Sequence, residues 1–190
     1  MIYARSLLYQ LAGKNLRLIV TATKAGCKVA ALELGWDLNG SPAEIAERLK
    51  AELNVEADYE LLYFDVENIA APIASGSYRV AGMIIVPCTM ATISAIAQGT
   101  SSDLIERAAD VVIKEKKKLL VVPRETPLSV IHLRNLLTLA EIGVTVLPAM
   151  PAFYHEPQSI EEMVDFVVGK ILDSLDIDHQ VFRRWQGSND

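Results

Sequence analysis

The segment that most constrains the fold of this chain is Leu119–Leu136, whose sequence is LLVVPRETPLSVIHLRNL. It opens with four branched apolar residues, a pattern typical of a strand that is buried on both faces of a parallel sheet. Arg124 and Glu125 follow closely, so we expect them at the carboxyl end of that strand. Ligands bind at this edge of open α/β sheets, where a guanidinium can hold phosphate and a carboxylate can transfer a proton. The alternative interpretation is an Arg–Glu surface pair that simply follows a strand.

Strands and helices alternate along the chain. The expected strands cover residues 16–21, 59–64, 83–86, 119–122 and 144–147. The expected helices cover residues 3–12, 24–34, 42–53, 103–116, 129–142 and 159–175, with a further helix after residues 87–92. This order predicts one doubly wound α/β domain over residues 1–190, with a parallel sheet, helices on both faces and a C-terminal tail from about residue 176. Phe182 and Trp185 in that tail suggest that it binds a partner or acts as a lid.

Several helix starts carry capping signals. Ser41 with Glu44, and Ser159 with Glu162, have the spacing of capping boxes, and we expect Ser102 to cap the helix that begins at residue 103.

Composition narrows the class of protein. The hydrophobic content of 51% and the mean hydropathy of +0.25 are high for a soluble chain, and subunit interfaces would account for part of them. The net charge of −6 argues against a nucleic-acid partner. The apolar runs are far shorter than the roughly 20 residues of a membrane helix, and the N-terminus lacks the pattern of a signal peptide. We therefore expect a homo-oligomer with no membrane association.

The cysteines and histidines give no metal signature. Cys27 and Cys88 are far apart in the sequence and are expected to be reduced thiols of a cytoplasmic protein. His132, His155 and His179 lack the spacing of zinc ligands, so no metal site is predicted.

Polar side chains gather after the expected strands. They are Thr23, Thr89, Thr92, Arg124, Glu125 and Tyr154. Because the carboxyl ends of parallel strands meet at one edge, this clustering predicts a nucleotide or another phosphate ligand. The small polar loop Ile69–Tyr78 could close over such a ligand, although most loops of this kind are connectors.

Five motifs carry a resemblance to a known family. They are ASGS (74–77), VPCTMATIS (86–94), LIERAADVVIKEK (104–116), VPRETP (122–127) and PAFYHEPQS (151–159), and in this order and spacing they resemble the UbiX-type flavin prenyltransferases. The resemblance implies a Rossmann-like or flavodoxin-like fold and transfer of a dimethylallyl group from dimethylallyl monophosphate to N5 and C6 of reduced FMN. It also implies dodecamers with metal-free active sites between subunits, and a product, prenylated FMN, that serves UbiD-type decarboxylases.

The resemblance assigns roles to residues of this chain. Thr23 would lie near the FMN phosphate, Glu33 would reach the flavin site from a neighbouring subunit, and Glu125 would assist departure of the substrate phosphate. The positions around the two phosphates, or the interface that shapes them, would be Arg107, Lys114, Arg124, Tyr154 and Lys170. We expect the cofactor to be held by Thr23, Thr89, Thr92, Arg107 and Arg124, the substrate phosphate by Lys114, Tyr154 and Lys170, and catalysis to involve Glu125, Glu33 and Tyr154.

Each role has a structural alternative. Tyr154 could pack in an interface, Lys114 and Lys170 could be solvated helix residues, and Glu33 could be a surface acid. His155 is interpreted as a hydrogen-bond partner in its loop rather than as a catalyst.

The chain also departs from the family pattern. Lys170 stands where many members have arginine, and Ile69 stands where some have tryptophan. Met1 falls just after the glycine-rich turn with which members begin, so the first strand of the sheet is expected to be missing. We expect either that the natural polypeptide begins upstream, or that strand 16–21 closes against strand 83–86.

Two other functions are open at this point. A cysteine-type oxidative decarboxylase on the same fold would carry a PASANT-like segment where this chain has PCTMAT (87–92). The second alternative is a flavin-binding scaffold without catalytic activity.

Overall fold

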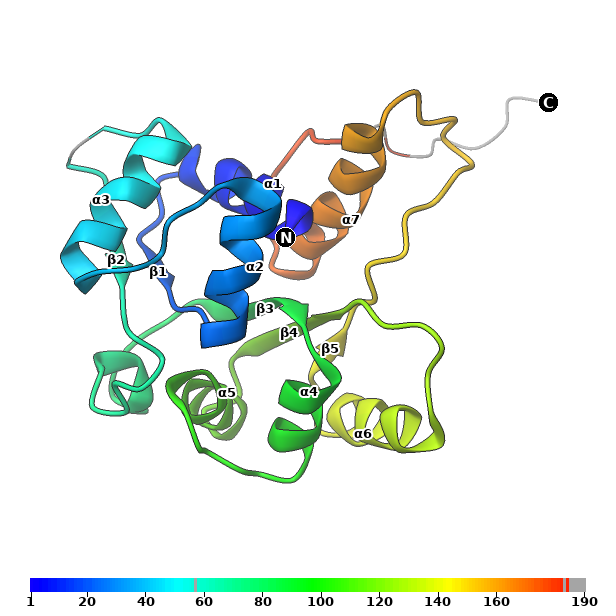
Figure 1. Cartoon of the computed structure of the whole chain (residues 1–190). Coiled ribbons are helices and arrows are strands. Elements are labelled where there is room, and N and C mark those ends of the chain that lie inside the picture. Colours follow the sequence, from blue (N-terminus) through cyan, green and yellow to red (C-terminus); the bar gives the residue numbers. More distant parts are fainter. Residues whose placement is uncertain (57, 183, 185–190) are drawn as a thin grey trace.

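The structure is a computed structural model that describes residues 1–56, 58–182 and 184. Its strands form two parallel sheets, one of two strands and one of three (Figure 1). In the first, β1 (Leu18–Val20) pairs with β2 (Leu61–Tyr63). In the second, β4 (Lys118–Pro123) lies between β3 (Gly82–Cys88) and β5 (Thr145–Val146).

The predicted α/β class with parallel strands is confirmed. The structure also shows that the strands form two separate sheets, with the interruption between β1 and β3. β1 and β3 do not pair with each other, so the expected closure of strand 16–21 against strand 83–86 does not occur in the described residues. Each of these two strands therefore has one edge without a strand neighbour.

The helices lie on both sides of the β3–β4–β5 ladder. They are α1 (Ile2–Ala12), α2 (Lys24–Leu34), α3 (Pro42–Leu53), α4 (Met90–Ala97), α5 (Leu104–Lys114), α6 (Val130–Glu141) and α7 (Ile160–Ser174), with a short 3₁₀ helix at Pro72–Ala74. Figure 1 shows α4, α5 and α6 on one side of the ladder, and α1, α2 and α7 on the other. This is the two-sided cover that the alternation of elements predicts.

β4 joins two hydrophobic cores because its side chains alternate between the faces of the sheet. Leu120 and Val122 pack into the core formed with α1, α2, α3 and α7. Leu119 and Val121 pack into the core formed with α4, α5 and α6. All four side chains are buried, which confirms that this segment is a strand covered on both faces.

The helix caps agree with the sequence at some starts and differ at others. The box at Ser41 and Glu44 is closed, because each side chain accepts a hydrogen bond from the backbone N–H of the other residue. The prediction that Ser102 caps α5 is wrong: Asp103 is the cap, and its carboxylate accepts from the N–H of Glu106 at 2.9 Å. Ser102 lies one residue too early for its hydroxyl to face the first free N–H groups.

The second predicted capping box, at the start of α7, is only half formed. The Ser159 hydroxyl accepts from the N–H of Glu162 at 3.1 Å, as expected. The Glu162 carboxylate, however, accepts from the N–H of Gln158 at 2.7 Å instead of from Ser159. The Glu162 carboxylate therefore holds the backbone at Gln158, one residue before the Ser159 cap.

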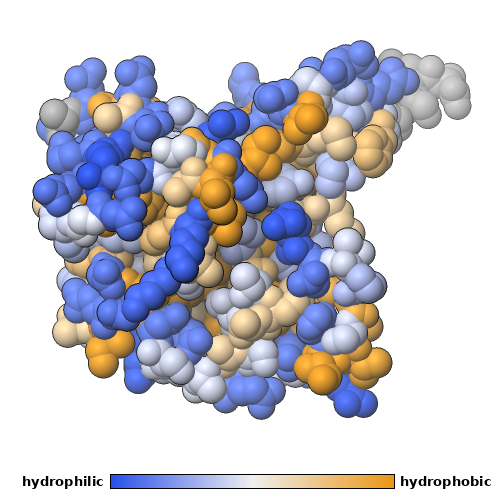
Figure 2. Space-filling model, in the orientation of Figure 1, coloured by the Kyte–Doolittle hydropathy of each residue, from blue (hydrophilic) through white to orange (hydrophobic). Residues whose placement is uncertain are grey.

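Apolar side chains reach the surface in several patches (Figure 2). On α6, Val130, Ile131, Leu133 and Leu137 are exposed, while only Asn135 and Leu139 are buried. Met150 and Phe153, in the loop after β5, are also exposed. A helix that turns its apolar side outward presents a surface suited to contact with another protein. Within the described residues, no helix is both long enough and apolar enough to cross a membrane.

Candidate functional site

The carboxyl ends of β3, β4 and β5 meet at one edge of their ladder, because the three strands are parallel. Thr89 follows β3, and Arg124 and Glu125 follow β4. Pairing with β4 continues beyond β5, since the N–H of Leu147 donates to the carbonyl of Val121 at 3.0 Å and that of Ala149 to Pro123 at 2.9 Å. These bonds lead the chain from this edge into the loop that holds Tyr154.

Two helices start where strands end. The Thr23 hydroxyl, after β1, accepts from the N–H of Gly26 at 2.9 Å and caps α2. The Thr89 hydroxyl accepts from the N–H of Thr92 at 3.2 Å and caps α4, and the two threonine hydroxyls lie 3.0 Å apart. The three predicted threonines thus cap or line helix N-termini, where free N–H groups and the helix dipole favour an anion.

Arg124 and Glu125 are both exposed, as their place after β4 predicts. One oxygen of the Glu125 carboxylate accepts from the N–H of Thr126 at 3.2 Å. Among the described residues, Arg124 forms no ion pair within 4.0 Å. Its guanidinium is therefore available to an anion at this edge.

Glu33, near the end of α2, lies within electrostatic range of Arg124 in the same chain. Its carboxylate is paired with the amino group of Met1. That hydrogen bond lowers the pKa of Glu33, and the positive charge of Arg124 adds to the effect. Glu33 is thus held as a carboxylate on the Arg124 side of the molecule.

Tyr154 and Lys170 are brought to the same part of the molecule by Phe166. The rings of Tyr154 and Phe166 meet edge to face, with their centroids 5.8 Å apart. Lys170 is exposed and follows Phe166 by four residues on α7, a spacing that places both on one side of the helix. The Tyr154 ring thus packs on the face of α7 that also carries Lys170, one turn further along the helix.

Lys114 is not brought to this edge within one chain, and Arg107 precedes it on the same helix. Both are exposed on α5, and Lys114 ends that helix just before the amino end of β4. β4 spans six residues, so about 20 Å of strand separates that end from Arg124. Arg107 is paired with Asp110, with 3.6 Å between nitrogen and oxygen. Lys114 can therefore reach a phosphate at the Arg124 edge only from a neighbouring copy of the chain.

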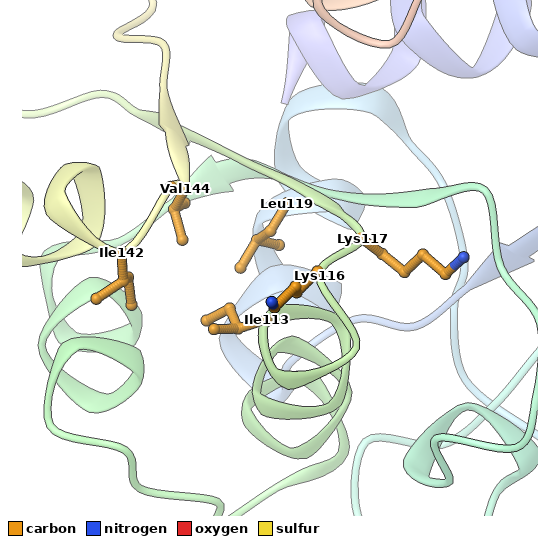
Figure 3. A pocket seen from close by; sticks show the side chains of 7 residues that line it. Ile113, Lys116, Lys117, Leu119, Ile142 and Val144 are labelled. Atoms are coloured by element: carbon orange, nitrogen blue, oxygen red, sulfur yellow. The ribbon is translucent and has the colours of Figure 1, made fainter.

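Two shallow hollows lie away from the predicted site. The first, of about 210 Å³, is lined by Ile113, Lys116, Lys117, Leu119, Ile142, Gly143 and Val144 (Figure 3). The second, of about 190 Å³, adjoins it and shares Ile113 and Ile142. Both lie toward the amino ends of β4 and β5, and neither includes a predicted site residue. Among the described residues, no group of three or more histidines, cysteines or acids could hold a metal ion.

The amino-acid sequence of the whole chain identifies its family. Its sequence matches the Flavoprotein family over residues 1–181. The chain belongs to the flavoprotein family.

Its relatives within that family are named for one activity. This flavoprotein is 49% identical to a flavin prenyltransferase UbiX from Synechocystis sp. over 187 residues, which cover 98% of this chain and 91% of the relative. The crystal structure of AnUbiX in complex with FMN and dimethylallyl pyrophosphate matches with a TM-score of 0.86 at 37% identity, covering 99% of this chain and 92% of that one. A dodecameric FMN-dependent UbiX-like decarboxylase from Escherichia coli O157:H7 matches with a TM-score of 0.85 at 38% identity, covering 98% and 93%. By contrast, an FMN-dependent cysteine decarboxylase from thioviridamide biosynthesis shares the fold alone, at 13% identity and a TM-score of 0.55.

Two further polar groups are buried, namely the hydroxyl of Thr21, which the sequence did not single out, and the ring nitrogens of His155, which was expected to be a hydrogen-bond partner in its loop. The hydroxyl of Thr21, directly after β1, is buried and has no hydrogen-bond partner among the described residues. Neither ring nitrogen of His155 has a partner in the part of the chain that the structure describes, so the prediction that His155 forms a hydrogen bond in its loop is wrong there; its ring stacks on Phe166 instead. For Thr21 the only sequence signal was its position, since it is a polar residue near a predicted one. Buried groups of this kind are costly unless a ligand or water satisfies them.

These groups fit FMN. The N-termini of α2 and α4 and the Arg124 guanidinium suit a phosphate, and the Thr21 hydroxyl can donate to a polar atom of the flavin or its phosphate. In the first turn of α2, the Cys27 thiol lies 3.9 Å from the hydroxyl oxygen of Tyr63. Burial raises the pKa of Tyr63, so this hydroxyl stays neutral and can donate a hydrogen bond at physiological pH.

Proposed function

We propose that this flavoprotein transfers a dimethylallyl group from dimethylallyl monophosphate to N5 and C6 of reduced FMN, and that UbiD-type decarboxylases use the prenylated FMN. The observation that carries the proposal is the Arg124–Glu125 pair at the carboxyl end of β4, beside the segment that leads to Tyr154. The names of its relatives and the AnUbiX complex support it.

The chain's residues hold the leaving phosphate and supply its proton. The Arg124 guanidinium, the Lys170 ammonium and the Tyr154 hydroxyl donate hydrogen bonds to the phosphate oxygens. These contacts stabilise the negative charge that grows as the allylic carbon–oxygen bond breaks and both electrons leave with the phosphate. Glu125 transfers a proton to a leaving oxygen, acting as a general acid. Reduced FMN, when bound, supplies the nucleophilic N5 and C6 atoms.

The remaining predicted residues act through binding and assembly. Thr23, Thr89 and Thr92 present the N-termini of α2 and α4 to FMN, and Glu33 reaches the flavin site of a neighbouring subunit, where it takes part in catalysis. Arg107 and Lys114 add positive charge around the phosphates, Lys114 from a neighbouring subunit because within one chain it lies far from Arg124. This division of residues between copies requires a homo-oligomer.

The proposed assembly is a dodecamer, and the proposed location is the cytoplasm. The exposed apolar side of α6 would be covered by neighbouring copies, and the related protein from Escherichia coli O157:H7 is dodecameric. Sedimentation equilibrium measures the mass of the assembly directly. A monomer at micromolar concentration would contradict the shared site.

Mass spectrometry of the flavin tests the activity. The protein is mixed anaerobically with reduced FMN and either dimethylallyl monophosphate or dimethylallyl pyrophosphate, and the flavin is then analysed. We expect FMN to gain one dimethylallyl unit with the monophosphate, and more slowly with the pyrophosphate, the ligand in the AnUbiX complex. FMN that binds but never gains mass would support a scaffold, and oxidation of a C-terminal peptidyl cysteine would support the cysteine decarboxylase.

A further inference from the structure

The chain turns back on itself after α7. Asp176 adopts a left-handed backbone conformation, and the N–H of Ile177 donates to the carbonyl of Leu172 at 3.0 Å. The described residues that follow, 177–182 and 184, then lie against α7 and are called the return segment here. It belongs to the region that the sequence suggested as a lid or partner-binding tail; Trp185 of that tail lies outside the described residues.

Asp173 on α7 anchors the return segment. Its carboxylate accepts from both terminal nitrogens of Arg184, at 2.6 and 3.2 Å, and lies 3.1 Å from Nε2 of His179. The His179 side chain is only 1% exposed, and its Nδ1 accepts from the N–H of Val181 at 3.3 Å. Nε2 therefore carries the proton that points at Asp173. The Arg184 guanidinium, the His179 ring and the Val181 N–H are thus fixed relative to one another and to Asp173.

Phe182 packs directly against Gly169. A Cβ atom at Gly169 would overlap the Phe182 ring, so only glycine admits the ring at this place in α7. Glycine inside a helix costs about 1 kcal/mol relative to alanine, and this contact is a physical reason to accept that cost. The guanidinium carbon of Arg184 lies over the same ring, 5.6 Å from its centroid.

Phe166 connects this contact to the candidate site. Its ring lies 5.3 Å from that of Phe182, between centroids. The same ring stacks on His155 at 5.2 Å and meets the Tyr154 ring edge to face at 5.8 Å. A continuous row of rings therefore runs from the return segment to Tyr154, although the sequence separates Phe182 from Tyr154 by 28 positions.

We propose that Phe182 and Phe166 are positioning residues, through which the return segment holds the Tyr154 hydroxyl beside Lys170 for the phosphate of the substrate. The inference rests on the proposed function and deepens it. Tyr154 lies in a loop and its side chain is 59% exposed, and its edge-to-face packing against Phe166 and His155 restricts its orientations. A side chain that is already oriented loses less entropy when the phosphate binds, which lowers the KM for the substrate.

The main test is Phe182→Ala in the holoenzyme, with two readouts. We expect the KM for dimethylallyl monophosphate to rise about three- to tenfold, the effect of one lost aromatic contact, with the Kd for FMN unchanged. Amide hydrogen exchange of a peptide covering residues 149–158 should become faster in the same variant. Exchange needs no prenyl transfer, so it reports on positioning even if the proposed function fails.

A double-mutant cycle and two controls sharpen the test. Gly169→Ala should disturb the loop clearly less in the Phe182→Ala background than in the wild-type background, because the ring that its methyl would chiefly displace is then absent and only the contact with Cε1 of His179, 2.9 Å from the methyl position, remains. Phe182→Tyr, which keeps the ring, should restore the KM, and Gln180→Ala, at an exposed position of the return segment, should change neither readout.

Three outcomes would overturn the inference. They are unchanged exchange in residues 149–158 of Phe182→Ala, equal losses of affinity for FMN and substrate, and full additivity of the two substitutions in the cycle. If wild-type protein prenylates no flavin, the proposed function fails, and exchange and the cycle then decide the positioning role alone.

Discussion

Glu125→Gln tests the central chemical role. In the structure the Glu125 side chain is exposed and accepts one hydrogen bond, from the N–H of Thr126 at 3.2 Å. Glutamine has the same size and keeps an acceptor oxygen, so this bond survives and the free energy of unfolding should change by less than about 0.5 kcal/mol. What glutamine lacks is a transferable proton. Loss of a general acid slows the chemical step by about 10²-fold or more, or roughly 2.7 kcal/mol of barrier.

Single-turnover kinetics measure that step directly. Reduced FMN bound to the protein is mixed with saturating dimethylallyl monophosphate, the reaction is quenched at intervals, and the prenylated flavin is quantified by mass spectrometry. Glu52→Gln is the matched control, because Glu52 is exposed on α3, away from the carboxyl edge of β4. We expect wild-type rates in the control and unchanged FMN affinity in both variants. A Glu125→Gln rate within threefold of wild type would refute the proton-transfer role.

Three further predictions follow from the site, the core and the return segment. Lys170→Met should weaken dimethylallyl monophosphate far more than FMN, because one cation at a single phosphate is lost, and Lys170→Arg should retain most of the affinity; equal losses for both ligands in calorimetric titration would indicate a structural role instead. Leu120→Ala should lower the free energy of unfolding by about 2–5 kcal/mol, since this side chain is fully buried at the centre of β4, and urea denaturation showing a loss below about 1 kcal/mol would contradict that packing. Hydrogen bonding from Arg184 lowers the pKa of Asp173 below its usual 3.8, so the anchor contributes stability above about pH 4 and loses it as the pH falls through the folded-state pKa. Hydrogen exchange across residues 177–182, corrected for the intrinsic pH dependence of exchange, should therefore show release of the return segment in acid, whereas in Asp173→Asn the segment should already be released at neutral pH; identical profiles for both proteins would exclude Asp173 as the anchor.

Local pattern was enough to predict much of the fold. The branched run before Pro123 predicted β4 and its burial, because a strand covered on both faces needs apolar residues at every position. The place of Arg124 and Glu125 followed from the end of that run. The closed capping box at Ser41 followed from spacing within four residues, since the bonds that close it join neighbours in the sequence.

Other features depended on contacts between residues far apart in the sequence. The cap of α5, by contrast, has a local signal, because Glu106 stands three residues after Asp103, the spacing of a capping signature, whereas Ile105 stands three residues after Ser102. The distance of Lys114 from Arg124 arises because α5 ends at the amino end of β4. The buried hydroxyl of Thr21 depends on the elements that cover it.

The return segment shows the same division most clearly. The sequence alone marked Phe182 as an apolar residue in a C-terminal tail and Gly169 as a glycine within a helical pattern. Only the tertiary structure places one against the other and connects them through Phe166 to Tyr154. Helices and strands follow from the periodicity of neighbouring side chains, but a contact between two elements depends on the shape of both surfaces after folding. The chemical groups of the site were therefore readable from the sequence, whereas the packing that orients them was decided by the folded structure.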